Sequence, residues 1–239
     1  MTDPNRRLFL VGAASAGFLV AGCGGKGALA KSPEHDKDEG GEGEEEVTPA
    51  EDLMREHGAL NRILLVYEES ARRLDAAEAL PVDALVQSAQ IIRNFVESYH
   101  EKLEEDFLFP RFVKANKLVD LVTTLEAQHV AGRALTASIL TMATPAGLQL
   151  EDQRKKLAGT LRSFSRMYRP HEAREDTVLF PALAKIVSHH ELHELGEQFE
   201  DKEHELFGKE GFEGVVAQIA VIEQAFDLHD LAKFTPVIG

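Results

Sequence analysis

Histidine and glutamate recur in this sequence with a spacing that suits metal chemistry. The segment HEKLEEDFLFP (residues 100–110) matches HEAREDTVLFP (residues 171–181) at six of eleven positions, 71 residues further along the chain. His57 and His129 form a second pair, 72 residues apart. Such self-similarity indicates an internal duplication. Each half of the repeat therefore carries one histidine followed by a His-x-x-x-Glu motif.

The His-x-x-x-Glu motif places a nitrogen and a carboxylate on the same face of a helix. Residues i and i+4 lie about one turn apart, so each histidine and its glutamate can point to one place in a helical interior. Imidazole and carboxylate together suit iron, manganese or zinc, whereas a soft-metal site would need thiolates. The predicted metal ligands are His57, His100, Glu104, His129, His171 and Glu175.

The number of donor atoms predicts two ions rather than one. Each carboxylate has two oxygens and can bridge a pair of metals. Four imidazole nitrogens, four carboxylate oxygens and a solvent-derived bridge would fill about ten of about twelve positions around two six-coordinate ions. About two positions stay open, where dioxygen, peroxide or nitric oxide could bind.

Two other interpretations of the same residues are weaker. Four core histidines could be satisfied by neighbouring carboxylates without any metal, but the duplicated spacing does not favour this. Glu97-x-x-His100 and Glu126-x-x-His129 also match the Glu-x-x-His element of ferritin-like carboxylate proteins. That arrangement would place both elements on consecutive helices and leave two of the histidines without a role.

The elements that must carry these residues are helices, because apolar residues recur with a helical period from residue 50 onward. Expected helices span residues 49–77, 82–109, 117–143 and 148–179, and two shorter ones span 185–207 and 212–227. Thr48 and Pro49 suit the start of the first helix, and Pro110 and Pro181 are expected to end the second and the fourth. The predicted fold is all-α: an up-down-up-down four-helix bundle with two additional C-terminal helices.

These motifs together resemble the hemerythrin-like, HHE cation-binding family. The resemblance covers about residues 50–230 and rests on His57, His129 and the two His-Glu-x-x-Glu segments with their Leu-Phe-Pro endings. It implies a four-helix bundle around a non-haem di-iron centre. It also implies functions in oxygen carriage, O2 or NO sensing, and iron or redox handling.

The chain departs from the oxygen-carrying branch of that family at one ligand. That branch has His-x-x-x-His on its third helix, but here Arg133 stands four residues after His129. The branch also has His-x-x-x-x-Asp on its fourth helix, and Asp176 matches that spacing. The missing fifth histidine argues against reversible oxygen storage.

Three further residues are candidates for the centre. Glu101 and Glu172 directly follow their histidines, so they are candidates for extra ligands or for acceptors of imidazole N–H groups. His204 lies in a segment that weakly echoes the one before His129, which makes it a candidate fifth histidine. An ordinary surface histidine is the favoured interpretation of His204.

The first 49 residues predict export and membrane attachment. Residues 1–23 resemble a signal peptide in which Arg6 and Arg7 suit twin-arginine export, and VAGC at residues 20–23 resembles a lipobox with Cys23 lipidated. Residues 24–49 are acidic and glycine-rich, which predicts a disordered tether ahead of the bundle at residues 50–239. The predicted location is a membrane-anchored lipoprotein facing the periplasm. Gly24 favours the outer membrane over the inner one.

Composition excludes several classes of function. The 239 residues include 41 acidic and 26 basic side chains, for a net charge of −15, which argues against a nucleic-acid partner. The one cysteine excludes an internal disulfide and a thiolate metal cluster. Because the sequence shows no nucleophile triad or phosphate-binding loop, any catalysis would belong to the metal.

The predicted function is therefore metal and ligand binding rather than enzymatic turnover. Two non-haem iron ions would bind O2, NO or peroxide, or the protein would handle iron, and manganese and zinc are less favoured as cofactors. Two alternatives stay open: a di-iron enzyme that acts on peroxide or nitric oxide, and a bundle in which the metal is purely structural.

Overall fold

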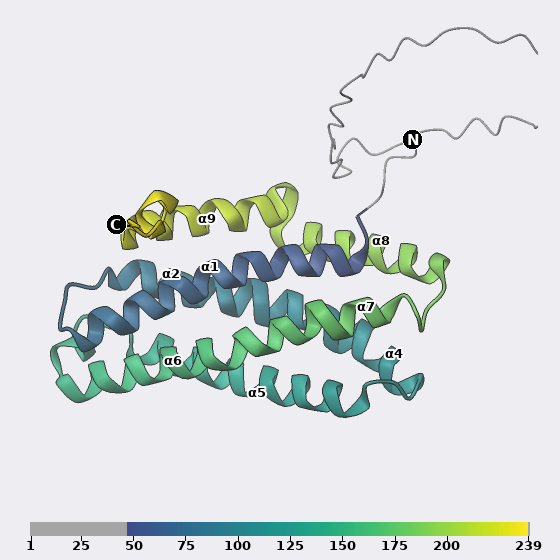
Figure 1. Cartoon of the computed structure of the whole chain (residues 1–239), viewed down its shortest axis with the longest axis horizontal. Coiled ribbons are helices and arrows are strands. Elements are labelled where there is room, and N and C mark those ends of the chain that lie inside the picture. The colour runs from purple at the N-terminus through teal and green to yellow at the C-terminus, as the bar shows by residue number, and fades with distance from the viewer. Residues whose placement is uncertain (1–46, 239) are drawn as a thin grey trace, which may run out of the picture. The chain divides into compact units, whose positions relative to one another are not determined.

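The structure of the chain is a computed structural model, and it describes residues 47–238. The predicted signal peptide, the lipobox at Cys23 and nearly all of the predicted tether lie outside these residues. All regular structure in the described part is helical, which confirms the all-α class (Figure 1). The longer helices are α1 (Pro49–Asp75), α2 (Val82–Ile91), α5 (Val119–Met142), α6 (Glu151–Arg174), α8 (His189–Phe207) and α9 (Gly211–Phe226).

The long helices pack into a bundle around a continuous apolar core. Helix α6 packs against both α1 and α5, and α2 contacts α1 and α5. Helices α8 and α9, which correspond to the two predicted C-terminal helices, pack against α1, and α9 also contacts α2 (Figure 1). No helix between residues 47 and 238 combines the length and the apolar character needed to cross a membrane.

The start of α1 follows the sequence prediction. Thr48 is the N-cap residue, and its hydroxyl accepts a hydrogen bond from the backbone N–H of Glu51. The Glu51 carboxylate in turn accepts one from the backbone N–H of Thr48 at 2.9 Å. This reciprocal capping box satisfies two N–H groups that a helix start leaves without partners. It fixes where α1 begins, and hence the direction in which His57 points.

Wider helical turns interrupt both helices that carry a His-x-x-x-Glu motif. After α2 come the π-helical η1 (Ile92–His100), α3 (Glu101–Leu103), the π-helical η2 (Glu104–Leu108) and α4 (Phe109–Lys114). After α6 come the π-helical η4 (Glu175–Leu179) and α7 (Phe180–Leu183). Single π-turns inside helices occur frequently at functional sites. Here η2 and η4 both begin at the glutamate of the motif.

The prediction that Pro110 and Pro181 end these helices was wrong. Each proline is the second residue of a helix that continues, α4 or α7. The residue before each proline donates its N–H five residues back, Phe109 to Glu104 and Phe180 to Glu175. Because the π-turn has already displaced the i→i−4 pattern, the missing N–H and the ring of proline are tolerated at this point.

Gly132 allows α5 to lie close to Tyr168 of α6. A Cβ atom at Gly132 would lie only 2.8 Å from Cζ of Tyr168, whose hydroxyl donates a 2.6 Å hydrogen bond to Glu101. Gly132→Ala is therefore expected to lower the free energy of unfolding by about 1–3 kcal/mol, as overpacking does in other cores. Chemical denaturation measures this change.

Gly159 provides a matched control on α6. No atom beyond its own helix backbone and chain neighbours lies within 4 Å of a Cβ built at this glycine. Gly159→Ala should therefore raise the free energy of unfolding by up to about 1 kcal/mol through helix propensity alone. Equal effects of the two substitutions would contradict the close contact with Tyr168.

Candidate metal centre

The six predicted ligands meet in the interior of the bundle. His57 comes from α1, His129 from α5 and His171 from α6, while His100 ends η1. Glu104 and Glu175 are the first residues of η2 and η4. None of the six side chains belongs to a residue more than 4% exposed. The duplication in the sequence thus corresponds to one shared cluster rather than to two separate sites.

The four imidazoles form two pairs. Nε2 of His57 lies 3.1 Å from Nε2 of His100, and Nε2 of His129 lies 3.2 Å from Nε2 of His171. Each pair combines the histidine of a first helix with that of the following second helix in the same repeat.

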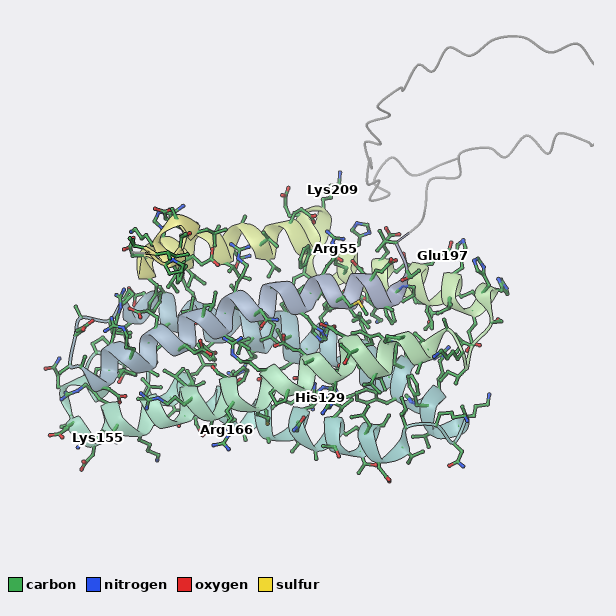
Figure 2. All side chains as sticks on the ribbon, in the orientation of Figure 1. Arg55, His129, Lys155, Arg166, Glu197 and Lys209 are labelled. Atoms are coloured by element: carbon green, nitrogen blue, oxygen red, sulfur yellow. The ribbon has the colours of Figure 1, made fainter. Side chains whose placement is uncertain are left out.

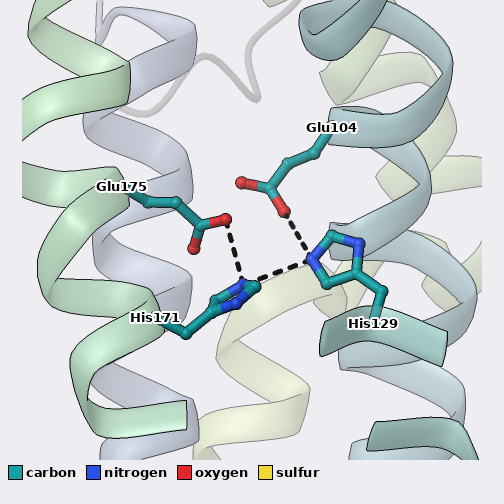
Figure 3. Close-up of side chains that lie close together, drawn as sticks. All are labelled: Glu104, His129, His171 and Glu175. Carbon is teal, nitrogen blue, oxygen red and sulfur yellow. Dashed lines mark hydrogen bonds and ion pairs between the residues drawn. The ribbon is translucent and has the colours of Figure 1, made fainter. Parts of the chain in front are cut away.

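Each glutamate contacts one histidine of each pair. Glu104 Oε2 lies 3.8 Å from His100 Nε2 and 3.4 Å from His129 Nε2. Glu175 lies 3.0 Å from Nε2 of His171 through Oε1 and 3.4 Å from Nε2 of His57 through Oε2. Figure 3 shows Glu104, His129, His171 and Glu175 converging, with His171 and Glu175 on one continuous helical stretch. Both carboxylates are therefore placed where they could bridge two positions.

The carboxylates of Glu104 and Glu175 have no hydrogen-bond donor. All four of their oxygen atoms are buried and accept no hydrogen bond from residues 47–238. Burying a carboxylate without a partner is costly, because water no longer solvates the charge. A metal cation would supply the missing partner. Four groups of side chains among residues 47–238 are close enough to hold one, and two of these contain Glu104: one with His129, His171 and Glu175, the other with His57 and His100.

Nδ1 of each of the four cluster histidines points away from the centre and has its own hydrogen-bond partner. His57 Nδ1 lies 2.7 Å from Asp176, His100 Nδ1 2.7 Å from Glu56, His129 Nδ1 3.1 Å from Glu105, and His171 Nδ1 2.8 Å from Gln128. All four partner atoms are oxygens that accept, so Nδ1 carries the hydrogen and Nε2 presents a lone pair inward. Metal-binding histidines are usually oriented in this way.

The Leu-Phe-Pro endings of the repeat also take part in the site. The ring of Phe180 stacks on His57 at 5.5 Å between centroids, and that of Phe109 stacks on His129 at 5.6 Å. Each phenylalanine thus covers a histidine of the other half of the repeat. The conformation of these two imidazoles is fixed on one side by an aromatic ring and on the other by a hydrogen bond.

Burial and neighbouring charges shift the acid–base properties of the cluster. Burial lowers the pKa of His57, but the carboxylates of Asp176 and Glu175 outweigh burial and raise it to about 10. Burial lowers the pKa of His100 well below its usual value. Burial, followed by the charge of Glu175, holds the pKa of Glu104 far above its usual value. Strongly shifted values in one buried cluster are typical of functional sites.

The other predicted residues lie around this cluster in different roles. Asp176 contacts a histidine, as described above. Glu101 accepts hydrogen bonds from Tyr168 and Arg133, and Glu172 accepts one from Asn61. Burial raises the pKa of each of these two glutamates to about 8. His204 is exposed on α8 and belongs to none of the described groups that could hold a metal.

Comparison with known proteins agrees with this geometry. Residues 48–147 match the model of the Hemerythrin HHE cation binding domain. "Uncharacterized protein Rv1995" of Mycobacterium tuberculosis (strain ATCC 25618 / H37Rv) is 45% identical over 238 residues, which cover 97% of this chain and 90% of that protein. "Uncharacterized protein Mb2018" of Mycobacterium bovis gives the same values. Residues 48–147 form a hemerythrin HHE cation-binding domain match. No solved structure matches the chain.

The match to the hemerythrin HHE domain indicates cation binding. The matched region contains His57, His100, Glu104 and His129, and the second half of the repeat adds His171 and Glu175. Iron is the ion typical of such domains. The clusters of buried histidine and glutamate are the part of the hemerythrin-like domain that could hold it.

Sequence reasoning missed three of the four Nδ1 partners, although the repeat contained the signal. Glu56 and Gln128 directly precede the first histidine of each half, and Glu105 stands five residues after His100, as Asp176 does after His171. All four partners are therefore related by the same duplication as the ligands. Searching the repeat for side chains with hydrogen-bonding oxygens, rather than for ligands alone, would have found them.

His129 and His204 allow a direct test of which histidines belong to the centre. His129 is fully buried and contacts both His171 and Glu104, whereas His204 is exposed. His129→Ala is expected to lose about half of the bound metal, because it removes one histidine pair. His204→Ala should retain all of it. Metal analysis of identically purified proteins measures this, and equal losses would indicate a five-histidine site that includes α8.

Proposed function

We propose that this hemerythrin-like protein binds two iron ions and uses them to bind a small ligand. His57 and His100 would hold one ion, His129 and His171 the other, and Glu104 and Glu175 would bridge them. The observation that carries this proposal is the convergence of four inward-facing lone pairs and two carboxylates without hydrogen-bond donors. Four imidazole nitrogens and two carboxyl groups that converge in this way form a ligand set that suits a pair of cations. We further propose the up-down-up-down order of helices for the bundle that holds them.

The residues of the chain determine which chemistry such a centre would support. Bound iron would supply redox chemistry and a position for O2, NO or peroxide. The fold keeps the centre dry, because every ligand residue is buried and Phe109 and Phe180 cover two of the imidazoles. Arg133, which occupies the place of a fifth histidine, forms ion pairs with Glu101 and Glu105 instead. We therefore favour ligand binding or iron handling over oxygen storage.

Metal content and an optical spectrum test this proposal. The chain is expected to contain two iron ions, and its reduced form should change its visible absorption when O2 or NO is added. A spectrum that does not respond to either ligand would show that the metal is structural. Peroxide consumption that scales with bound iron would instead identify an enzyme.

We also propose that the protein is exported and anchored through Cys23. Passage through the twin-arginine route would carry the folded bundle with its metal across the membrane, so that the cytoplasm selects the ion. This matters because divalent affinity alone would favour copper or zinc over iron. Replacing Arg6 and Arg7 with lysine should abolish export, as measured by fractionation of the cells. Unchanged export would indicate the general secretory route.

A further inference from the structure

The duplication that builds the metal centre is not exact, and several of its departures change the charge around the histidines. Glu56 accepts from Nδ1 of His100, but the equivalent residue, Gln128, accepts from Nδ1 of His171. A carboxylate is thus replaced by a neutral amide at the same distance from the equivalent ring. The repeat places Arg133, four residues after His129, where the first half has Asn61, four residues after His57.

The surroundings of the two histidine pairs also differ in charge, and again the first pair has more carboxyl groups without a cationic partner. Near His57 and His100 lie the carboxyl groups of Asp176 and Glu56. Glu56 also lies close to Glu203 and to Asp52, which is itself paired with Arg55. Within residues 47–238, no lysine or arginine ion pair to Asp176 or Glu56 is observed. The outer nitrogens of the first pair therefore both meet carboxyl groups that have no cationic partner among these residues.

The second pair also has acidic neighbours, Glu101 and Glu105, but both of them form ion pairs with Arg133. Next to His129 and His171, Gln128 is uncharged, and the Glu105 carboxylate forms ion pairs with both Arg133 and Lys102. The charge that Glu105 brings to His129 is therefore largely balanced. A cation at this position would also lie near the positive charge of Arg133.

We infer that the two metal positions are inequivalent, and that the position at His57 and His100 binds its cation first and more tightly. This inference rests on the proposed two-ion centre. A carboxylate that accepts from Nδ1 makes the imidazole a better electron donor than an amide does, and changes at such partners alter metal affinity about 10–100-fold. Glu56 acts through His100, so it is a positioning residue that sets affinity without touching the ion.

The repeat itself supplies the matched variants for a test. The full chain, freed of metal with a chelator, would be titrated with Zn²⁺, which has no redox chemistry. We expect two steps of one equivalent each, separated by at least about tenfold in affinity. At one equivalent, nitrogen NMR of the histidine rings should show shifts at His57 and His100 before those at His129 and His171.

Exchanging the two partners should reverse the order of filling. The double variant Glu56→Gln with Gln128→Glu keeps total charge and side-chain size, so a structural role for either residue alone would not predict a reversal. In this variant, His129 and His171 should shift first. Arg133→Asn, which copies Asn61, should tighten the second step and leave the first unchanged. Circular dichroism would establish that each variant is folded. If the double variant does not fold, Arg133→Asn alone still tests the inference.

Three results would overturn the inference. They are a single step of two equal equivalents, filling of His129 and His171 first in the parent, and an unchanged order in the double variant. Failure of the parent to bind any ion would contradict the proposed function itself, so the two failures are distinguishable. Two equal sites would leave the two-ion centre intact and remove only the inequivalence.

Discussion

Glu104→Gln is expected to remove most of the bound metal from the protein. Glu104 contacts one histidine of each pair, so its loss weakens both positions together, unlike the loss of one histidine. Metal content should therefore fall well below two ions per chain. The fold should persist, because neither oxygen of Glu104 accepts a hydrogen bond that the amide would lose.

Two measurements separate this effect from unfolding. Metal analysis of the purified variant gives its occupancy, and thermal unfolding of the metal-free proteins compares their stability. Glu126→Ala, at an exposed position on α5, is the control and should keep the metal content of the parent. If Glu104→Gln and Glu175→Gln both retained two ions, the carboxylate-bridged centre would be wrong.

Removal of the metal is expected to destabilise the parent protein strongly. A ligand that binds only the folded state stabilises it by about 4 kcal/mol when present at about a thousand times its dissociation constant. The buried glutamates and paired imidazoles exist as a site only in the folded bundle, so binding and folding should be coupled. The melting temperature of the iron-loaded protein should therefore fall clearly when a chelator is added.

The same experiment with Glu104→Gln provides the control for this prediction. Because that variant should bind little metal, its melting temperature should not depend on chelator. Equal melting temperatures for the loaded and the stripped parent would show that the ions contribute nothing to the folded state.

The positions of the histidines were predictable because the repeat and the helical period act together. Spacing of four residues on a helix determines a shared face, so His100 with Glu104 and His171 with Glu175 had to point in one direction. The N-cap at Thr48 was also predictable, because its hydrogen-bond partner Glu51 lies in the same helical turn. Interactions of this range can be predicted from spacing alone.

The features that were missed depend on contacts between helices. Glu56 reaches His100 and Gln128 reaches His171 only when neighbouring helices are rotated to a particular angle. The π-turns at Glu104 and Glu175 change that rotation. The spacing of apolar residues, which follows a period of 3.6, gives no sign of a π-turn. For the same reason Pro110 was mistaken for the end of a helix.

The Nδ1 hydrogen bonds around the cluster make metal binding sensitive to the pH of the surroundings. They turn two pairs of Nε2 lone pairs toward each other at 3.1 and 3.2 Å, an arrangement that is repulsive unless a positive charge lies between them. In the absence of metal, a proton on His57 would supply that charge in the first pair, consistent with the raised pKa of His57 and the lowered pKa of His100. Loading the centre is thus an ion exchange in which each arriving cation expels hydrogen ions. A protein placed outside the cytoplasm would then hold its metal less firmly whenever its surroundings become acidic.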